Sequence, residues 1–266
     1  NVLEMNGKYY VLGEEHKAFK GDKTEDNDYL IMTYGALAKE LHQEHITEAN
    51  VHIAAGLPLT WVGSQREEFE KYLLSERKIE FVYKDIPYKI NLVGCDVFPQ
   101  CYPAILSHIN QMNGVNMVAD IGNGTLNVMY VENHKPVQGK TYTEKLGVNQ
   151  CAIAMKNTVS NVFAVQISDA TVEQFIRTGT ADIAPKYLQI LKNKAAEYCE
   201  KIMECLQKYE YNPDLMRLYV VGGGGSLFRN FCKYDSERVT IIEDICAGAK
   251  GYENLSVQML RKNGIV

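Results

Sequence analysis

The sequence predicts an α/β protein in which strands and helices form layers, arranged in two domains. Apolar runs of strand length alternate with amphipathic stretches of helix length along most of the 266 residues, and this alternation is typical of layered α/β folds. Two glycine-rich turns, at 122–125 and 222–226, each follow an apolar strand. Because glycine lets backbone N–H groups approach a phosphate closely, the two turns predict a nucleotide held between two halves of the protein.

Composition narrows the class of protein further. The chain has 46% hydrophobic residues and a net charge of −5 at pH 7, which is enough apolar material for two moderate cores and argues against broad contact with nucleic acid. We therefore expect any contact with DNA to go through a partner protein. No apolar run approaches the length of a membrane span, and the first residues do not resemble a signal peptide, so the expected location is the cytoplasm, without a membrane partner.

The seven cysteines are predicted to be buried free thiols. They form no C-x-x-C pair, and no histidine accompanies them at zinc-finger spacing, so a reducing cytoplasm is expected to keep them reduced. They are Cys95, Cys101, Cys151, Cys199, Cys205, Cys232 and Cys246.

The first half of the chain is rich in strands. Asn6-Gly7 lies between two short apolar runs and predicts a hairpin, because a type I′ turn takes positive φ at both positions. Amphipathic stretches predict helices at 29–44, 65–74 and 103–111. Apolar runs predict strands at 50–55, 80–83, 88–93, at 97–99, and on both sides of the first glycine-rich turn at 115–119 and 126–131.

The second half is rich in helices. Helices are predicted at 148–162, 170–177, 185–209, 226–232 and 245–261, and strands at 218–221 and 239–242. Pro185 suits the first turn of the long helix, where its missing N–H costs nothing. The change of character near 140–147 predicts a first domain over residues 1–143 and a second over residues 144–266.

Each glycine-rich turn has a competing interpretation. The segment Asp120 to Thr125 is also compatible with a bulged hairpin without a ligand. The four consecutive glycines Gly222 to Gly225 are harder to explain without a ligand, since each loses more conformational entropy on folding than any other residue. A dinucleotide fingerprint would require glycine at position 227, which is leucine.

Five short segments, taken in order, resemble the actin-like ATPases. Asp120-Ile121-Gly122-Asn123-Gly124-Thr125 is similar to their second phosphate-binding turn, and Val220-Val221-Gly222-Gly223-Gly224 to their adenosine-binding turn. The other three resemble the plasmid-segregation branch, the ParM/StbA proteins: Ala55-Gly56-Leu57-Pro58-Leu59, Tyr72-Leu73-Leu74, and Asp96-Val97-Phe98-Pro99-Gln100 followed by Ala104. Their order and spacing are together more specific than any one motif.

The resemblance implies an actin-like, ribonuclease H-like ATPase fold, with two α/β domains facing a nucleotide cleft. It implies ATP, or GTP, with Mg²⁺ as cofactors, nucleotide-dependent self-association into cytoskeletal filaments, and plasmid DNA segregation with the DNA attached through an adaptor. Family members begin with a hairpin that carries a first phosphate turn, an Asp followed by Gly and then a Lys; the opening hairpin 2–12 resembles the continuation of that sheet. We therefore expect the chain to start partway through its first domain, and hydrolysis to depend on that first turn.

Candidate site residues follow from the two turns. Ionised Asp120 would orient waters around a Mg²⁺ that bridges the phosphates, a role that suits a cation keeping much of its hydration shell. Phosphate oxygens would lie against Gly122, Asn123, Gly124 and Thr125, and the nucleoside against Gly222, Gly223 and Gly224, with Ser226 capping the next helix. The competing interpretation of Asp120 is a cap of its own turn.

Gln100 is the candidate for chemistry. Pro99 ends an apolar strand, which leaves the next side chain at the edge of the sheet where ligands bind in α/β proteins. A neutral amide is a poor base but can hold a water in line with a terminal phosphate, as glutamine does in some GTPases. The alternative is that Gln100 caps the helix predicted near Pro103.

Two other functions remain open. A sugar or metabolite kinase on the same nucleotide-binding fold would transfer the phosphoryl group to a small hydroxyl, and it would need an Asp base beside a second pocket, for which the sequence offers no candidate. A non-catalytic nucleotide-sensing scaffold would need no first phosphate turn.

Overall fold

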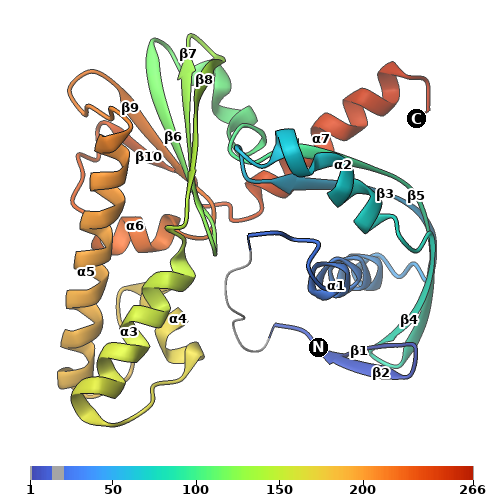
Figure 1. The fold of residues 1–266 in the computed structure, drawn as a ribbon, viewed down its shortest axis with the longest axis horizontal. Coiled ribbons are helices and arrows are strands. Elements are labelled where there is room, and N and C mark those ends of the chain that lie inside the picture. The colour runs from blue at the N-terminus through green and yellow to red at the C-terminus, as the bar shows by residue number, and fades with distance from the viewer. Residues whose placement is uncertain (1, 14–20, 266) are drawn as a thin grey trace. The chain divides into compact units, whose positions relative to one another are not determined.

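The computed structural model describes residues 2–13 and 21–265, which form two compact units (Figure 1). The first unit comprises Asn1–Leu57 and Trp61–Phe98, and the second comprises Pro58–Thr60 and Pro99–Val266. The predicted domain division at residues 143/144 lies inside the second unit.

The first unit is a sheet covered on one face by two helices. Its strands run in the order β2-β1-β4-β5-β3, and α1 (Asp28–Gln43) and α2 (Val62–Leu73) pack against it. Along β4, Ile79, Phe81 and Tyr83 are buried and alternate with exposed Lys78 and Glu80, the pattern of a sheet with one face in solvent. The strands are β1 (Val2–Met5), β2 (Lys8–Val11), β3 (Glu48–Leu57), β4 (Lys78–Tyr83) and β5 (Ile86–Pro99).

Turn chemistry explains both hairpins of the first unit. Asn6 and Gly7 have φ of 53° and 71°, so the predicted hairpin between β1 and β2 is confirmed. Lys84 and Asp85, with φ of 51° and 62°, join β4 to β5 in the same way. The two strands predicted at 88–93 and 97–99 are wrong as separate elements, because β5 continues through Gly94 and runs from Ile86 to Pro99.

The second unit contains a mixed sheet in the order β10-β9-β6-β7-β8. The strands β10 (Val239–Ile241), β9 (Arg217–Val221) and β6 (Val115–Ile121) are parallel, and β7 (Leu126–Glu132) and β8 (Lys135–Glu144) extend the sheet by antiparallel pairing. The sequence prediction missed β8. This edge strand is polar and partly exposed, so it lacks the apolar run that marks a buried strand.

Helices cover both faces of this sheet, as Figure 1 shows. On one face lie α3 (Val148–Phe163), α4 (Asp169–Thr178), α5 (Pro185–Lys208) and α6 (Gly225–Phe231). On the other lie the 3₁₀ helix η1 (Pro103–Gln111) and α7 (Ala247–Lys262). Buried residues of β6 point alternately into the two cores, Ala119 and Ile121 to the first and Val118 to the second.

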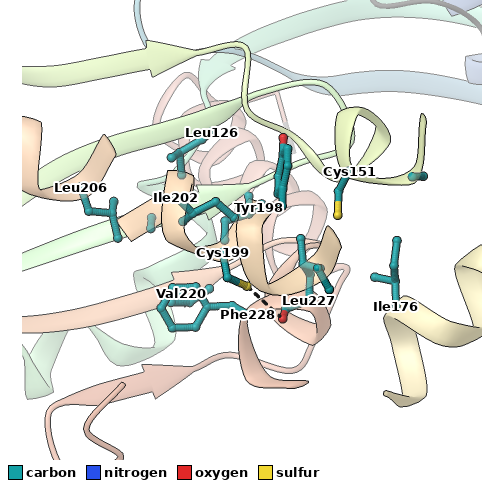
Figure 2. Close-up of a cluster of buried hydrophobic side chains, with 14 of the residues drawn as sticks. Leu126, Cys151, Ile176, Tyr198, Cys199, Ile202, Leu206, Val220, Leu227 and Phe228 are labelled. Atoms are coloured by element: carbon teal, nitrogen blue, oxygen red, sulfur yellow. Dashed lines mark hydrogen bonds between the residues drawn. The ribbon is translucent and has the colours of Figure 1, made fainter. Parts of the chain in front are cut away.

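The larger core holds α5 against α6 and the sheet. Figure 2 shows Tyr198, Ile202 and Leu206 of α5 beside Leu227 and Phe228 of α6. A disulfide joins Cys199 to Cys232, with their Cα atoms 5.0 Å apart, so the prediction of seven buried free thiols is wrong for this pair. It is also wrong for Cys246, which is free but exposed. The sequence separation of 33 residues gives no local signal of such a bond. Over residues 2–13 and 21–265, no helix is both long and apolar enough to cross a membrane.

Candidate functional site

The two glycine-rich turns meet at one end of the second unit's sheet. β6 and β9 are parallel neighbours, with Asp120 opposite Val221, so both strands end at the same edge. The N–H of Gly224 donates to the carbonyl of Ile121 at 2.8 Å and joins the turns directly. The carboxyl ends of parallel strands are where ligands bind in α/β sheets.

The first turn is held from both sides by backbone hydrogen bonds. The N–H of Gly122 donates to the carbonyl of Thr125 at 2.9 Å, and the first residues of α3 donate to the carbonyls of Gly122 and Asn123 at 3.0 and 2.9 Å. Gly147, just before α3, has no room for a side chain, since a Cβ there would lie 2.3 Å from the Asn123 carbonyl oxygen. No local pattern in the sequence marks this residue, because its close contact comes from a turn distant in the chain.

The second turn consists of glycines with different constraints. Gly222 has φ of +86°, and a Cβ there would lie 2.6 Å from Asp120 Oδ1; a Cβ on Gly224 would lie 2.2 Å from Ile121 Cγ2. Gly223 faces open space, because a Cβ at this residue would have no described neighbouring atom within 4 Å. The turn therefore packs tightly at two residues and stays accessible at the one between them.

Ser226 does not cap α6, so that prediction is wrong. The helix begins at Gly225, its N-cap is Gly224, and no side chain caps it. The tight backbone contact between the two turns starts the helix earlier than the serine pattern indicates. Ser226 lies in the first turn of α6 and is half-buried.

Asp120 sits between the two turns. Its Oδ2 accepts the N–H of Cys101 at 3.1 Å, and Cys101 has φ of 79°, uncommon for a residue with a side chain. Burial raises the pKa of Asp120 to about 6, an effect that the Cys101 hydrogen bond only partly opposes. A carboxylate with few partners of its own suits a Mg²⁺ whose other ligands are phosphates and waters. Among residues 2–13 and 21–265, no cluster of three or more potential metal-ligating side chains is present.

Gln100 lies next to Cys101 and contacts the strand after the first turn. Its Oε1 accepts a hydrogen bond from Asn127 Nδ2 at 2.9 Å. The alternative that Gln100 caps η1 is wrong, because η1 begins at Pro103 with Tyr102 as its N-cap and no side-chain cap. Asn127, which is buried, is a second site residue that sequence analysis missed.

The geometry brings the predicted site residues to one edge of the second unit's sheet. Gln100 and Asp120 are linked through Cys101 and Asn127, and the two turns are in contact. Ser226 ends the second turn, but it does not cap α6 as predicted. The arrangement offers backbone N–H groups, a carboxylate and an amide at one edge of the sheet, which together can bind phosphate and a hydrated cation.

Comparison with known proteins agrees with this architecture. Residues 1–102 match the sequence model of the actin-like proteins N terminal domain. No curated protein sequence matches the chain. The actin-like fold predicted from the sequence is confirmed by the solved structures that follow.

Similar structures span almost the whole chain at low sequence identity. An archaeal actin homolog, Ta0583 in complex with ADP, has a TM-score of 0.71 and 16% identity, covering 97% of this chain and 89% of its own. A non-polymerisable quadruple mutant of pCBH ParM has a TM-score of 0.72 and 17% identity, covering 97% and 86%. The Alp12 filament structure has a TM-score of 0.60 and 15% identity, covering 97% and 83%.

Proposed function

We propose that this protein binds ATP, or GTP, with Mg²⁺ at the two turns of the second unit, and that it assembles into filaments that act in plasmid DNA segregation. The observation that carries the proposal is the direct contact between the turns, through the 2.8 Å hydrogen bond from Gly224 to Ile121. One similar structure contains ADP and another is a filament, which supports the same two properties here. Self-association, an adaptor that links the filament to DNA, and a cytoplasmic location are parts of this proposal.

In the proposed site each group has a distinct role. The backbone around Gly122 and Thr125 holds phosphate oxygens, and Gly223 lies against the nucleoside. Asp120 orients the water shell of the cation, which when bound neutralises phosphate charge. Gln100 orients the attacking water. Hydrolysis is proposed for a chain that also carries the first phosphate turn of the family, which is not among these 266 residues.

The assembly part of the proposal is tested by sedimentation. The protein with its first phosphate turn should pellet with ATP and Mg²⁺ and stay in the supernatant without nucleotide. The 266-residue chain should show no nucleotide-dependent pelleting. Pelleting of the 266-residue chain that responds to ATP would show that the first turn is dispensable, and ATP-independent behaviour of the longer chain would remove the filament function.

The binding part is tested by Asp120→Ala. This variant should bind Mg²⁺-ATP at least about tenfold more weakly in calorimetry, because a group that orients the cation's water shell is lost. Asp214→Ala is the matched control, because Asp214 is exposed and precedes β9 at the end opposite the turn. The Asp214→Ala variant should bind Mg²⁺-ATP with the parental affinity. Unchanged affinity of Asp120→Ala would leave Asp120 only as the acceptor of the Cys101 N–H.

A further inference from the structure

Asn127 is a buried amide at the centre of the site. It lies on β7 opposite Asp120 of β6, and only 1% of its surface is exposed. A buried amide that lacks hydrogen-bond partners destabilises a protein by about 1–3 kcal/mol, so the partners of Asn127 show what holds it there. An asparagine side chain can donate two hydrogen bonds and accept two.

All of these four hydrogen bonds are present, and they come from four segments. Asn127 Oδ1 accepts from the N–H of Leu59 at 3.2 Å and from Thr143 Oγ1 at 2.8 Å. Asn127 Nδ2 donates to Gln100 Oε1 at 2.9 Å and to Thr125 Oγ1 at 3.4 Å. The last two partners are the proposed water-orienting residue and a residue of the first turn.

The orientation of this network is fixed by the backbone. An N–H group can only donate, so the N–H of Leu59 determines which end of the Asn127 amide carries the oxygen. Asn127 Nδ2 therefore faces Gln100, and Gln100 must turn its Oε1 toward Asn127. Pro58 has no N–H, so Leu59 provides the first backbone donor after Leu57. The segment Ala55 to Leu59, which resembles the plasmid-segregation proteins in sequence, thus contributes a hydrogen bond to the site.

The hydrogen bonds of Asn127 also leave two neighbouring groups, on Gln100 and Thr125, with a hydrogen to donate. With Oε1 facing Asn127, Gln100 Nε2 is left to donate elsewhere, and no hydrogen bond from it is found among residues 2–13 and 21–265. The Thr125 hydroxyl oxygen accepts from Asn127, so its hydrogen is also left to donate elsewhere. Two oriented donors beside a carboxylate suit the oxygens of a phosphate and of the attacking water.

We propose that Asn127 is a positioning residue for nucleotide hydrolysis, which acts by holding the Gln100 amide with Oε1 inward and Nε2 free to donate. This inference rests on the proposed function. In the step concerned, the water oxygen forms a bond to the terminal phosphorus, the bond from that phosphorus to the bridging oxygen breaks, and the nucleoside diphosphate leaves with the electron pair. The water gives up one proton to solvent, so that nucleoside triphosphate and water yield nucleoside diphosphate, inorganic phosphate and a proton.

The test is a double-mutant cycle between Asn127→Ala and Gln100→Ala in a chain with its first phosphate turn. Gln100→Ala should lower kcat by about 10²-fold with little change in nucleotide affinity. Asn127→Ala should lower kcat by about tenfold in the parent and by less than about twofold in the Gln100→Ala background, because it acts through Gln100. Equal effects of Asn127→Ala in both backgrounds would overturn the proposal.

The control separates positioning from loss of stability. Asn116 is also buried, on the neighbouring strand β6, and its amide donates to the carbonyls of Asn113 and Gly114 at the far end of that strand. Asn116→Ala should reduce stability and leave kcat at the parental value. If Asn127→Ala does not fold, Thr143→Val removes one donor to Asn127 Oδ1 and should give a smaller loss of kcat, again only when Gln100 is present.

A second readout needs no turnover. In ¹H–¹⁵N spectra, the Gln100 side-chain amide should give a well-dispersed, rigid pair of resonances in the parent and an averaged pair in Asn127→Ala, with Asn116→Ala like the parent. An averaged pair in the parent would overturn the positioning role. A parent that neither binds nor hydrolyses nucleotide, but keeps a rigid Gln100 amide, would overturn only the proposed function.

Discussion

The two glycine-rich turns differ in what they contribute to the site. The first joins two antiparallel strands and carries polar side chains, with Asp120 before it and Thr125 and Asn127 after it. The second joins a strand to α6 and consists of glycines. In the proposed site, the first turn therefore provides the polar groups, whereas the second allows a ligand to approach the backbone closely.

Their rigidity has different origins as well. Hydrogen bonds from Gly122 and from the start of α3 hold the backbone of the first turn, so its shape depends on polar contacts. The second turn is held by steric contact of Gly222 and Gly224 with Asp120 and Ile121. Side-chain substitutions should therefore affect function at the first turn, and the addition of a side chain at Gly222 or Gly224 should affect folding at the second.

The largest expected effect is a loss of stability in Gly224→Ala. Its Cβ would lie 2.2 Å from Ile121 Cγ2 and 2.9 Å from the Ile121 carbonyl oxygen, and Ile121 is buried. Overpacking at a site with no room to relax costs about 1–3 kcal/mol or more, and urea denaturation should show a loss in that range.

The same substitution in an Ile121→Ala background gives the control. That background removes Cγ2, so the additional loss caused by Gly224→Ala should be smaller there than in the parent. If Gly224→Ala is as stable as the parent, the second turn is not fixed by steric contact, and the contrast between the turns fails.

Much of the fold could be predicted because its signals are local. The apolar stripe of each helix and the positive φ at Asn6-Gly7 depend only on neighbouring residues. The edge strand β8 was missed because its sequence, Lys135–Glu144, is polar and mostly half-buried or exposed. The units also divide away from residues 143/144, because β6 pairs with β9 far along the chain, with Asn116 opposite Arg217, and such long-range pairing leaves no mark in composition.

The part of the candidate site that local sequence patterns indicate consists of the two glycine-rich turns and the polar residues beside them. Asp120, Gln100 and both turns stand beside strand ends that the sequence marks. Asn127 was missed because it sits inside an apolar strand, where its partners come mostly from distant segments. Gly147 was missed for the same reason, since its contact with Asn123 exists only in the folded chain.

A smaller effect on stability is expected from Asp120→Asn, and it should depend on pH. Burial raises the pKa of Asp120 from 3.8 to about 6, so the folded protein keeps this proton over a pH range in which the unfolded chain has lost it. Stability therefore falls as pH rises from about 4 to about 6, and the full penalty is present above that range.

Removal of the charge should reverse this penalty. Without nucleotide, Asp120→Asn should be more stable than the parent by about 1–3 kcal/mol at pH 7.5, with the gain lost at pH 4 and below. Denaturation at both pH values measures it, and Asp214→Asn, at an exposed position, should show no such gain. A gain that persists at pH 4 would mean that the carboxylate charge is not its cause.

The smallest expected effect on folding, and the sharpest test of the comparison, is Gly223→Ala. Gly223 has no positive φ, and its Cβ would face open space, so the free energy of unfolding should change by less than about 0.5 kcal/mol. If the nucleoside lies against this residue, the added methyl group occupies part of its place. ATP affinity measured by calorimetry should then fall several-fold at unchanged stability, whereas Gly224→Ala, one residue away, is expected to lower stability. Parental affinity in a stable Gly223→Ala variant would show that the nucleoside does not lie against the second turn. The variant is expected to be free of strain, so neither strain nor unfolding could account for that result.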